Sequence, residues 1–443
     1  MITSKKKNRS QRSKPGMIPD CAYPQADKKC WDSGVLRIFI LPLFVVFFLF
    51  LVSCKPRTQG NDPTGSFSNI YDKRDTSNYT ALDVKQTTDG GYIILAMTDS
   101  CPYLLRVDKY GDFVWDTDTE ALGDYFEPAP VVLVSGTEYF FFCNVIRKET
   151  KYRHLALLKF SEPDNSFIEV DLSSFFLDIA NIVPMDAKIM SNKDIILLAL
   201  NSLHYRVLLH RIKPDGKKAW RRDYNFCISC SAKYPFLDRR FHFIESIEKS
   251  EENYYNVHSF LYEDIAQYPA CFEITTLNPA TGELVETNTL NKPFIATVWH
   301  SSDRFSAAYI NNDIVSFFIN SEKKVDWETQ QFQIDSNEGL EQIELLEDKP
   351  VFIKTAVVNG QTIVFFAGSS KSDQIVLYTY SVSSGICLDK KYFGGTRFYE
   401  AAGLIKTADG GIEILGTTYL ASLFDRICLF KLSKEELENM VGQ

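Results

Sequence analysis

Apolar and polar positions form short runs along most of the chain, and the order of these runs repeats. Residues 86–100 read QTTDGGYIILAMTDS, and residues 406–420 read KTADGGIEILGTTYL. The first copy continues through a second apolar run, a turn at Gly111 and a third run that ends at Trp115. Short apolar runs separated by glycine-containing turns predict antiparallel strands joined as hairpins.

The same order of runs recurs at a regular interval. Trp115, Trp220 and Trp327 end three of the copies at separations of 105 and 107 residues, and strand clusters recur at about half that distance. The unit is therefore about 52 residues long, and residues 65–432 hold about seven units. Repeats of about 40–50 residues with several strands each are typical of β-propeller blades.

We therefore predict an all-β fold, a single β-propeller with seven blades of four antiparallel strands. Six or eight blades stay open, as does a pair of β-sandwiches. The second strand of a unit, such as YIILAM at 92–97, is continuously apolar, which fits a blade covered on both faces. The last unit lacks its outermost strand, and SFSNIYDKR at 66–74 can supply it beside residues 427–432.

The D-G-G stretches also carry a resemblance to a known family. The segment YFGGTRFYEAAGLIKTADGGIEILGTT resembles the T-x-D-G-G-Y repeats of cell-envelope β-propellers of Bacteroidetes-like bacteria. The residues that match are Thr88, Asp89, Gly90, Gly91 and Tyr92 in the first unit and Thr407, Asp409, Gly410 and Gly411 in the last, where Ile412 replaces the Tyr. The resemblance implies a propeller outside the cytoplasm and no single activity. The two glycines have a structural explanation, because both would permit positive φ in a tight hairpin.

The N-terminal segment predicts a lipoprotein signal peptide. A basic start leads to Arg37, and IFILPLFVVFFLFLVS then runs without a charge to Cys54. The ending Leu51-Val52-Ser53-Cys54 resembles the bacterial lipobox, which implies cleavage before Cys54 and acylation of its thiol. We expect residues 1–53 to be the signal peptide, 54–64 a flexible tether and 65–443 the propeller. An uncleaved membrane helix stays open, and translation could start at Met1 or Met17.

The charge of the chain excludes some partners. Residues 1–53 contain nine Lys and Arg and three Asp, so the rest holds 39 basic and 54 acidic residues and a net charge of about −15. Such a surface repels phosphate backbones, and a nucleic-acid partner is not expected. The expected attachment is to the outer membrane of the cell envelope through the lipid. The sequence leaves the oligomeric state and the side of the membrane open.

Residues that could bind metal or form a disulfide are few. Asp116, Asp118 and Glu120 would share one strand face and form a weak Ca²⁺ candidate, but no Gly follows in calcium-loop spacing, and a solvated strand face is the preferred explanation. Cys227 and Cys230 form a lone C-x-x-C that could be a local disulfide or two free thiols. No metal-ligand spacing, nucleophile motif or cofactor fingerprint is present in the sequence, so no cofactor and no catalytic residue are predicted.

A ligand is expected at one mouth of the ring, where propellers present their loops. Positions near the starts of the innermost strands are the candidates, namely Tyr79, Arg239, Arg240, Trp299, His300, Arg397, Tyr399 and Glu400. Aromatic side chains beside Arg and carboxylate suit sugars or peptides. We therefore expect a non-catalytic binding or scaffold propeller for a glycan or protein. The alternative is a carbohydrate-active propeller whose carboxylates come from separate blades.

Overall fold

The computed structural model describes residues 65–442 with gaps at 74, 118–121, 148–150, 152, 173–181, 202–205, 226–242, 250–251, 262–270, 291, 302–303, 320–324, 326–330, 333, 335–337, 396 and 421–423. The chain divides into two compact units, residues 1–60 and 61–443, and the described residues belong to the second. Within the described part of the chain, no helix has both the length and the apolar composition needed to cross a membrane.

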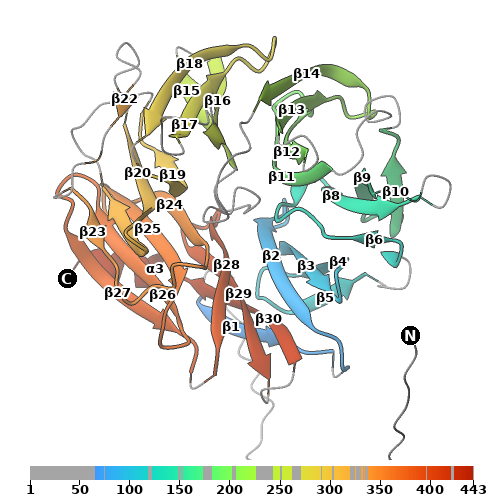
Figure 1. The fold of residues 1–443 in the computed structure, drawn as a ribbon. Helices are drawn as coiled ribbons and strands as arrows, with labels where there is room; N and C mark the ends of the chain where they lie inside the picture. Colours follow the sequence, from blue (N-terminus) through green and yellow to red (C-terminus); the bar gives the residue numbers. More distant parts are fainter. Residues whose placement is uncertain are drawn as a thin grey trace, which may run out of the picture. The chain divides into compact units, whose positions relative to one another are not determined.

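Seven sheets stand round a ring as the blades of a β-propeller, which confirms the predicted fold class (Figure 1). The innermost strands are β2 (Tyr79–Gln86), β6 (Tyr125–Phe126) with β7 (Leu133–Ser135), β11 (Ile182–Ile189), β15 (Phe243–Lys249), β19 (Phe294–Trp299), β24 (Val351–Val358) and β28 (Tyr399–Lys406). The second strands are β3 (Tyr92–Thr98), β8 (Glu138–Ile146), β12 (Ile195–Asn201), β16 (Glu252–Leu261), β20 (Phe305–Asn311), β25 (Gln361–Ser369) and β29 (Ile412–Leu420).

The two outer positions of each blade complete the sheets. The third strands are β4 (Cys101–Val107), β9 (Arg153–Ser161), β13 (Arg206–Ile212), β17 (Cys271–Leu277), β21 (Ile314–Phe318), β26 (Ile375–Ser381) and β30 (Phe424–Leu432). The outermost strands are β5 (Phe113–Asp116), β10 (Ser166–Val170), β14 (Lys218–Asn225), β18 (Leu284–Leu290), β23 (Leu340–Glu341), β27 (Cys387–Phe393) and β1 (Phe67–Tyr71). A short strand, β22 (Gln331–Phe332), adds to β18 in parallel. Helix α3 (Lys434–Val441) follows the last blade and begins at the N-cap Ser433.

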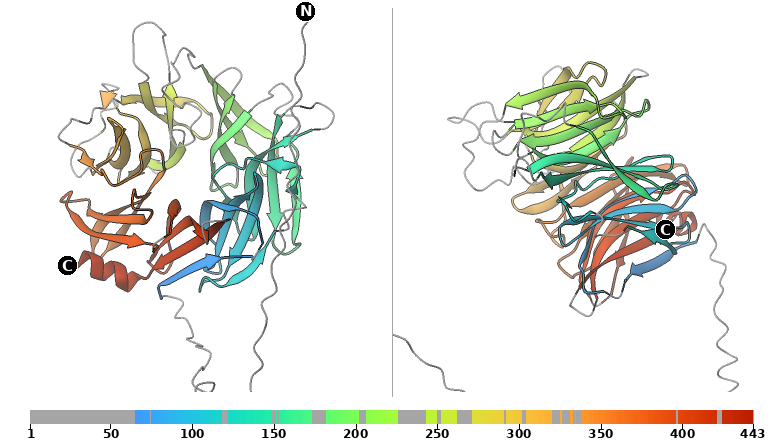
Figure 2. Two further views of the ribbon diagram at one scale, coloured as in Figure 1. Left: turned by 60° about the horizontal axis from the view of Figure 1, so that its bottom comes forward. Right: turned by 90° about the vertical axis from the view of Figure 1, so that its right-hand side faces the viewer.

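The ring closes as the sequence predicts. Strand β1 pairs antiparallel with β30, with Phe67 opposite Lys431 and Tyr71 opposite Ile427. The same strand reaches blade one, because Asn69 Nδ2 and Tyr71 Oη donate to the carbonyl oxygen of Gly111 at 2.8 and 2.9 Å. Strand β1 therefore joins the last blade to the first (Figure 2).

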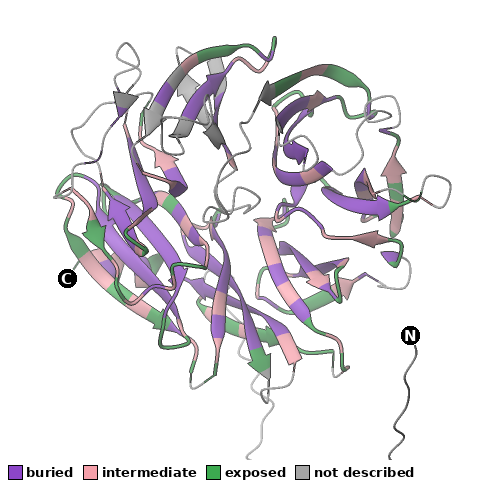
Figure 3. Ribbon diagram, viewed as in Figure 1, coloured by how far each residue is buried: buried purple, intermediate pink, exposed green. Residues whose placement is uncertain are grey.

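The hydrophobic core lies between the blades. The second strand of blade three and the third strand of blade six are buried along their whole length, and the six apolar clusters each combine side chains from neighbouring blades. Exposed residues gather on outermost strands such as β27, whereas buried residues follow the strands inside them (Figure 3). This distribution explains why the second strands read as continuous apolar runs.

The D-G-G turns use their two glycines for different reasons: positive φ, which glycine would permit at both positions, occurs at the first glycine and not at the second. Gly90 and Gly410 have φ values of +86° and +87°. Gly91 does not have positive φ, but a Cβ there would lie 2.5 Å from the carbonyl oxygen of Val107 on the third strand. The first glycine thus makes the turn and the second lets two strands approach. Asp89 completes the turn by accepting from Gly91 N at 3.2 Å.

Candidate functional site

Two of the predicted ligand-binding aromatics are packing residues. Tyr79 begins β2 and Tyr399 begins β28, as expected for positions at the starts of innermost strands. Both are buried. Tyr79 Oη donates to Asp75 Oδ2 at 2.6 Å, and the ring of Tyr399 lies 6.0 Å from that of Phe430. Neither ring is presented to a ligand.

The neighbouring candidates Glu400 and Arg397 differ in whether their charges are already paired within the protein. Glu400 Oε2 accepts from Lys349 Nζ at 2.8 Å, so its charge is already paired. Arg397 is exposed just before β28. Of the candidates on this edge of blade seven, Arg397 is the one with a free surface.

We expected Trp299 and His300 at the start of an innermost strand, but they lie at the end of one. Strand β19 ends at Trp299, so the prediction that this pair marks a strand start was wrong. The ring of Trp299 packs 4.9 Å from that of Phe305, and His300 Nε2 lies 2.7 Å from Ser306 Oγ. Burial lowers the pKa of His300 to about 4, so this imidazole is neutral at pH 7. The apolar run FIATVW ends at Trp299, where the strand ends, so the sequence did hold the signal for this position.

Several predicted residues lie outside the described part of the chain, namely Cys54, Asp118, Glu120, Cys227, Cys230, Arg239 and Arg240. Of the calcium candidates, Asp116 is described, and its Oδ2 accepts from Lys73 Nζ at 2.6 Å and from Tyr103 Oη at 2.7 Å. The described cysteines Cys101, Cys143, Cys387 and Cys428 are free thiols. Within the described ranges no group of three His, Cys, Asp or Glu side chains could hold a metal ion.

Charged side chains that the sequence analysis did not single out gather on the innermost strands. Blades one and three carry the same triplet on these strands, Asp83-Val84-Lys85 on β2 and Asp186-Ala187-Lys188 on β11. A β-bulge precedes each Asp, between Ala81 and Asp83 and between Pro184 and Asp186. Such a bulge re-aims the side chains that follow it.

Each Asp of the two triplets reaches across to the next blade. Asp83 Oδ2 accepts from Val132 N at 2.9 Å, and Asp186 Oδ2 accepts from Ile244 N at 2.8 Å. Both carboxylates are largely buried, with 13% and 14% of the side chain exposed. These two aspartates therefore tie neighbouring blades together and form the wall of the site.

The lysines of the triplets are more exposed than their carboxylate partners. Lys85 pairs with Asp83, and Lys188 Nζ lies 3.9 Å from Asp186 Oδ2. Their side chains are 37% and 40% exposed, about three times the values of their carboxylate partners.

Blade four adds a third carboxylate. Glu245 on β15 accepts from the hydroxyl of Thr297 on β19, and its Oε2 lies 3.5 Å from His258 Nε2. The Thr297 hydroxyl also lies 3.3 Å from the same imidazole nitrogen. Glu245 is thus held by side chains from its own blade and the next one.

Blade six adds a third lysine. Lys354 lies in the middle of β24 and is exposed between the buried Ile353 and Ala356. Among the described residues, no hydrogen bond or ion pair holds its amine. The pKa of Lys354 is lowered to about 8 by desolvation and by the positive charges of Lys188 and Lys85. The carboxylates of Glu245 and Asp83 act against this shift. We call Asp83, Lys85, Asp186, Lys188, Glu245 and Lys354 the inner-strand charge cluster.

The pKa of the Asp186 carboxyl is raised, whereas the pKa of a carboxyl in an ordinary ion pair is lowered. Burial raises its pKa, although Lys188 and the N–H groups of Ile244 and Ala187 act against the shift. The pKa of Lys188 is raised, chiefly by Asp186. The protonated amine is therefore favoured in this pair, and the carboxyl retains its proton to a higher pH than usual.

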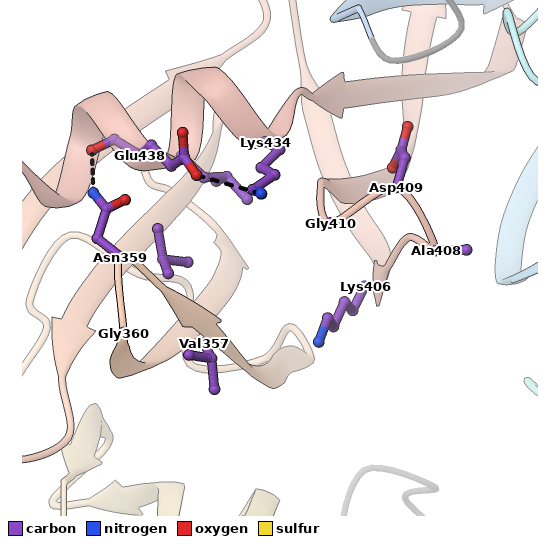
Figure 4. A pocket seen from close by; sticks show the side chains of 11 residues that line it. Val357, Asn359, Gly360, Lys406, Ala408, Asp409, Gly410, Lys434 and Glu438 are labelled. Carbon is purple, nitrogen blue, oxygen red and sulfur yellow. Dashed lines mark hydrogen bonds and ion pairs between the residues drawn. The ribbon is translucent and has the colours of Figure 1, made fainter.

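A cavity of about 500 Å³ lies elsewhere, between the β24–β25 turn, the second D-G-G turn and α3 (Figure 4). Lys434 Nζ lies 3.6 Å from Glu438 Oε1, and Asn359 Nδ2 donates to the carbonyl oxygen of Glu438 at 3.2 Å. Asp409 is paired with Lys431 on β30. The polar groups of this cavity hold its own walls together, and none of the predicted ligand-binding residues lines it.

Comparison with known proteins does not assign the chain to a family. No protein-family model matches the chain, and no curated protein matches it. Solved structures with a similar fold include Drosophila Semaphorin 2a, which is 8% identical with a TM-score of 0.44 over 82% of this chain and 74% of that chain. A mutant of the NanB sialidase from Streptococcus pneumoniae is 9% identical, with a TM-score of 0.41 over 85% and 70%. AofleA from Arthrobotrys oligospora is 7% identical, with a TM-score of 0.38 over 82% and 86%.

Proposed function

We propose that this chain is a lipid-anchored propeller of the bacterial cell envelope that binds a glycan or a protein partner without transforming it. The observation that carries the proposal is the state of the inner-strand charge cluster. Its carboxylates are held by backbone N–H groups, lysines and a hydroxyl, and its lysine side chains are more exposed than the aspartates they pair with. Such a surface is suited to holding a polar ligand and offers few free groups for proton transfer.

The envelope location rests on the N-terminal sequence. The uncharged run that ends in Leu51-Val52-Ser53-Cys54 would be removed as a signal, and the acylated Cys54 would hold the protein at the membrane. The polar segment 54–64 would then separate the ring from the lipid surface. Lys55 follows the Cys, and by analogy with bacterial sorting rules this favours the outer membrane over retention in the inner one.

A glycan-cleaving enzyme is the second candidate, and one observation favours it. Asp186 has a raised pKa, and Asp83 and Glu245 on other blades contribute with it to the electrostatic environment of Lys188. A protonated carboxyl near an ionised one is the arrangement that glycoside hydrolysis uses. Against this candidate, each of the three carboxyl groups already accepts hydrogen bonds that fix it to the blades.

Binding and product analysis on the same samples decide between the two functions. The full chain, purified in detergent, is screened against immobilised glycans and peptides, and each glycan that binds is incubated with it and examined by mass spectrometry. We expect retention of intact ligand. Cleavage by the wild type that disappears in Asp186→Asn would overturn the binding proposal in favour of the enzyme.

A further inference from the structure

The cavity beside α3 lies where blades six and seven meet, and three elements supply its walls (Figure 4). The β24–β25 turn contributes Val357 and Asn359, the end of β28 and the D-G-G turn contribute Lys406 and Asp409, and α3 contributes Glu438. The volume of about 500 Å³ lies within the usual range for sites that enclose a small molecule. Its lining shares no residue with the inner-strand charge cluster.

Helix α3 contacts the turns of both blades, so the cavity has fixed walls. Asn359 Nδ2 of blade six donates to the carbonyl oxygen of Glu438 at 3.2 Å. On the side of blade seven, a Cβ placed on Gly410 would lie 3.3 Å from Cδ of Lys434, so the aliphatic part of this lysine packs against the D-G-G turn. A site whose walls are already in place loses little conformational entropy when a ligand binds.

The carboxylates that line the cavity are paired, whereas one of its amines is not. Asp409 is paired with the buried Lys431 on β30. Glu438 Oε1 lies 3.6 Å from Lys434 Nζ. Lys406 is exposed at the end of β28, and within the described part of the chain no hydrogen bond or ion pair reaches its amine (Figure 4). The lining therefore has one positive charge that its own carboxylates do not balance.

Apolar surface lines the same cavity. Val357 is 67% exposed, and the buried Val358 and Leu437 also contribute to the lining. Removal of exposed apolar surface from water is favourable, so a ligand with an apolar part would be stabilised against Val357. An unpaired amine and an exposed apolar side chain in one cavity fit a ligand that has one negative charge beside an apolar group.

We propose that this cavity binds a carboxylate ligand whose charge pairs with Lys406 and whose apolar part covers Val357. A free branched carboxylic acid and the C-terminal residue of a peptide both have this chemistry. A phosphate group fits less well, because it carries about −1.5 to −2 charges at pH 7 and the carboxylates of Glu438 and Asp409 would repel the excess. The site is additional to the surface described under the proposed function and does not rest on it, since the residues are different.

Isothermal titration of the full chain in detergent tests the proposal with matched probes. Isovalerate is the free carboxylate and isovaleramide its uncharged equivalent, and a pentapeptide that ends in valine is compared with its C-terminal amide. We expect saturable binding of at least one carboxylate, with its amide about tenfold weaker or more. Binding of the peptide alone would identify a chain end as the ligand, and binding of isovalerate alone would identify the free acid. Binding of neither, or tighter binding of inorganic phosphate than of both, would overturn the proposal.

Variants of the two central residues assign the binding to this cavity. Lys406→Met should reduce the affinity by about tenfold or more, since one charge-assisted hydrogen bond is lost, whereas Lys406→Arg should retain most of it. Val357→Thr keeps the shape of the side chain but replaces a methyl group with a hydroxyl, and it should weaken binding by about threefold.

The matched control is Lys213→Met, which removes an exposed lysine from the β13–β14 turn of blade three. This variant should bind the carboxylate as the wild type does. Equal affinities for wild type and Lys406→Met would overturn the proposal. An equal loss in Lys213→Met would also overturn it, because the carboxylate would then respond to the overall charge of the protein and not to this cavity.

A second measurement avoids any dependence on how the variants fold. The wild-type chain is briefly acetylated with and without the bound carboxylate, and mass spectrometry measures the modification of each lysine. Lys406 should be protected by the ligand, and Lys213 should be modified to the same extent in both samples. Modification of Lys406 at the same rate with and without the ligand would contradict the assignment.

Discussion

Trp115 Nε1 donates a hydrogen bond to Glu162 Oε1 at 3.1 Å, across the junction between blades one and two. The equivalent contact recurs between blades three and four, where Trp220 Nε1 donates to the carbonyl oxygen of Pro279 at 3.0 Å. Both tryptophans lie on outermost strands opposite an arginine, Arg106 and Arg211 respectively. At these two junctions the tryptophan of one blade thus holds the turn of the next blade.

The contact between Trp115 and Glu162 should be measurable as a coupling. Glu162 also accepts from Tyr139 Oη at 2.7 Å and lies 3.7 Å from Arg106 Nε, so it is the centre of the junction. We expect Trp115→Phe and Glu162→Gln each to lower the free energy of unfolding by about 1 kcal/mol. Denaturant unfolding of both variants and the double variant should give a coupling energy of about 0.5–1 kcal/mol. Strictly additive losses would show that the two residues act separately.

Replacement of Gly91, the second glycine of the D-G-G turn, should cause a steric clash. Gly91→Ala would place a methyl group 2.5 Å from the carbonyl oxygen of Val107, so strands β3 and β4 would have to move apart. We expect a loss of about 1–3 kcal/mol, the usual cost of overpacking. Gly395→Ala is the control, because a Cβ there meets no atom within 4 Å. Thermal unfolding of both compares them, and similar melting temperatures would contradict the steric explanation.

The blade architecture was predictable because each blade is encoded by short apolar runs that are close together in the sequence. Each blade repeats the same order of apolar strands and turns, so the count of seven and the closing role of β1 followed from spacing and from the missing strand of the last unit. The short β23 and the added parallel strand β22 were not predictable, since two-residue strands leave no periodic signal.

The site was harder to predict because it is assembled from strands far apart in the chain. Tyr79 and Tyr399 have the right residue type for binding, but the sequence cannot distinguish an aromatic side chain at a mouth from one buried between blades. The inner-strand charge cluster left only a weak signal. The triplet D-x-K occurs on two innermost strands, at Asp83 and Asp186, but it also occurs at Asp215 and at Asp389, which lie outside these strands.

The lipid anchor remains a prediction from the N-terminal residues. A strain grown with a palmitate analogue should incorporate label into the wild-type chain, because acylation follows the signal peptidase motif at Cys54. Cys54→Ala should lose the label. Label retained in this variant at the wild-type level would mean that the acyl chain is attached at another residue.

Stability should fall as the solution becomes mildly acidic, and His210 is one cause. Its side chain is fully buried on β13, and burial lowers the pKa of the imidazole to about 3. Below pH 6.5 the unfolded chain takes up a proton that the folded chain does not, so stability is lost as the pH falls from 6.5 toward 3. Between pH 7 and pH 5 this residue should contribute a loss of about 2 kcal/mol. In His210→Leu the decrease over that range should be smaller by this amount, and an unchanged pH profile would contradict the assignment.

Removal of the closing strand should affect stability far more than removal of the tether. Strand β1 pairs with β30 over five residues, and Ser433 N donates to Ser66 Oγ at 2.8 Å just beyond it. Deletion of residues 65–74 would leave the edge of β30 unpaired and remove the contacts of Asn69 and Tyr71 with blade one, so the melting temperature should fall and the exposed edge should promote aggregation. Deletion of residues 55–64 keeps all of these contacts and should leave the melting temperature nearly unchanged. Differential scanning calorimetry with light scattering compares the two chains. Equal melting temperatures would mean that the remaining blades hold the ring closed without β1, and the pairing of the two ends would then have little part in its stability.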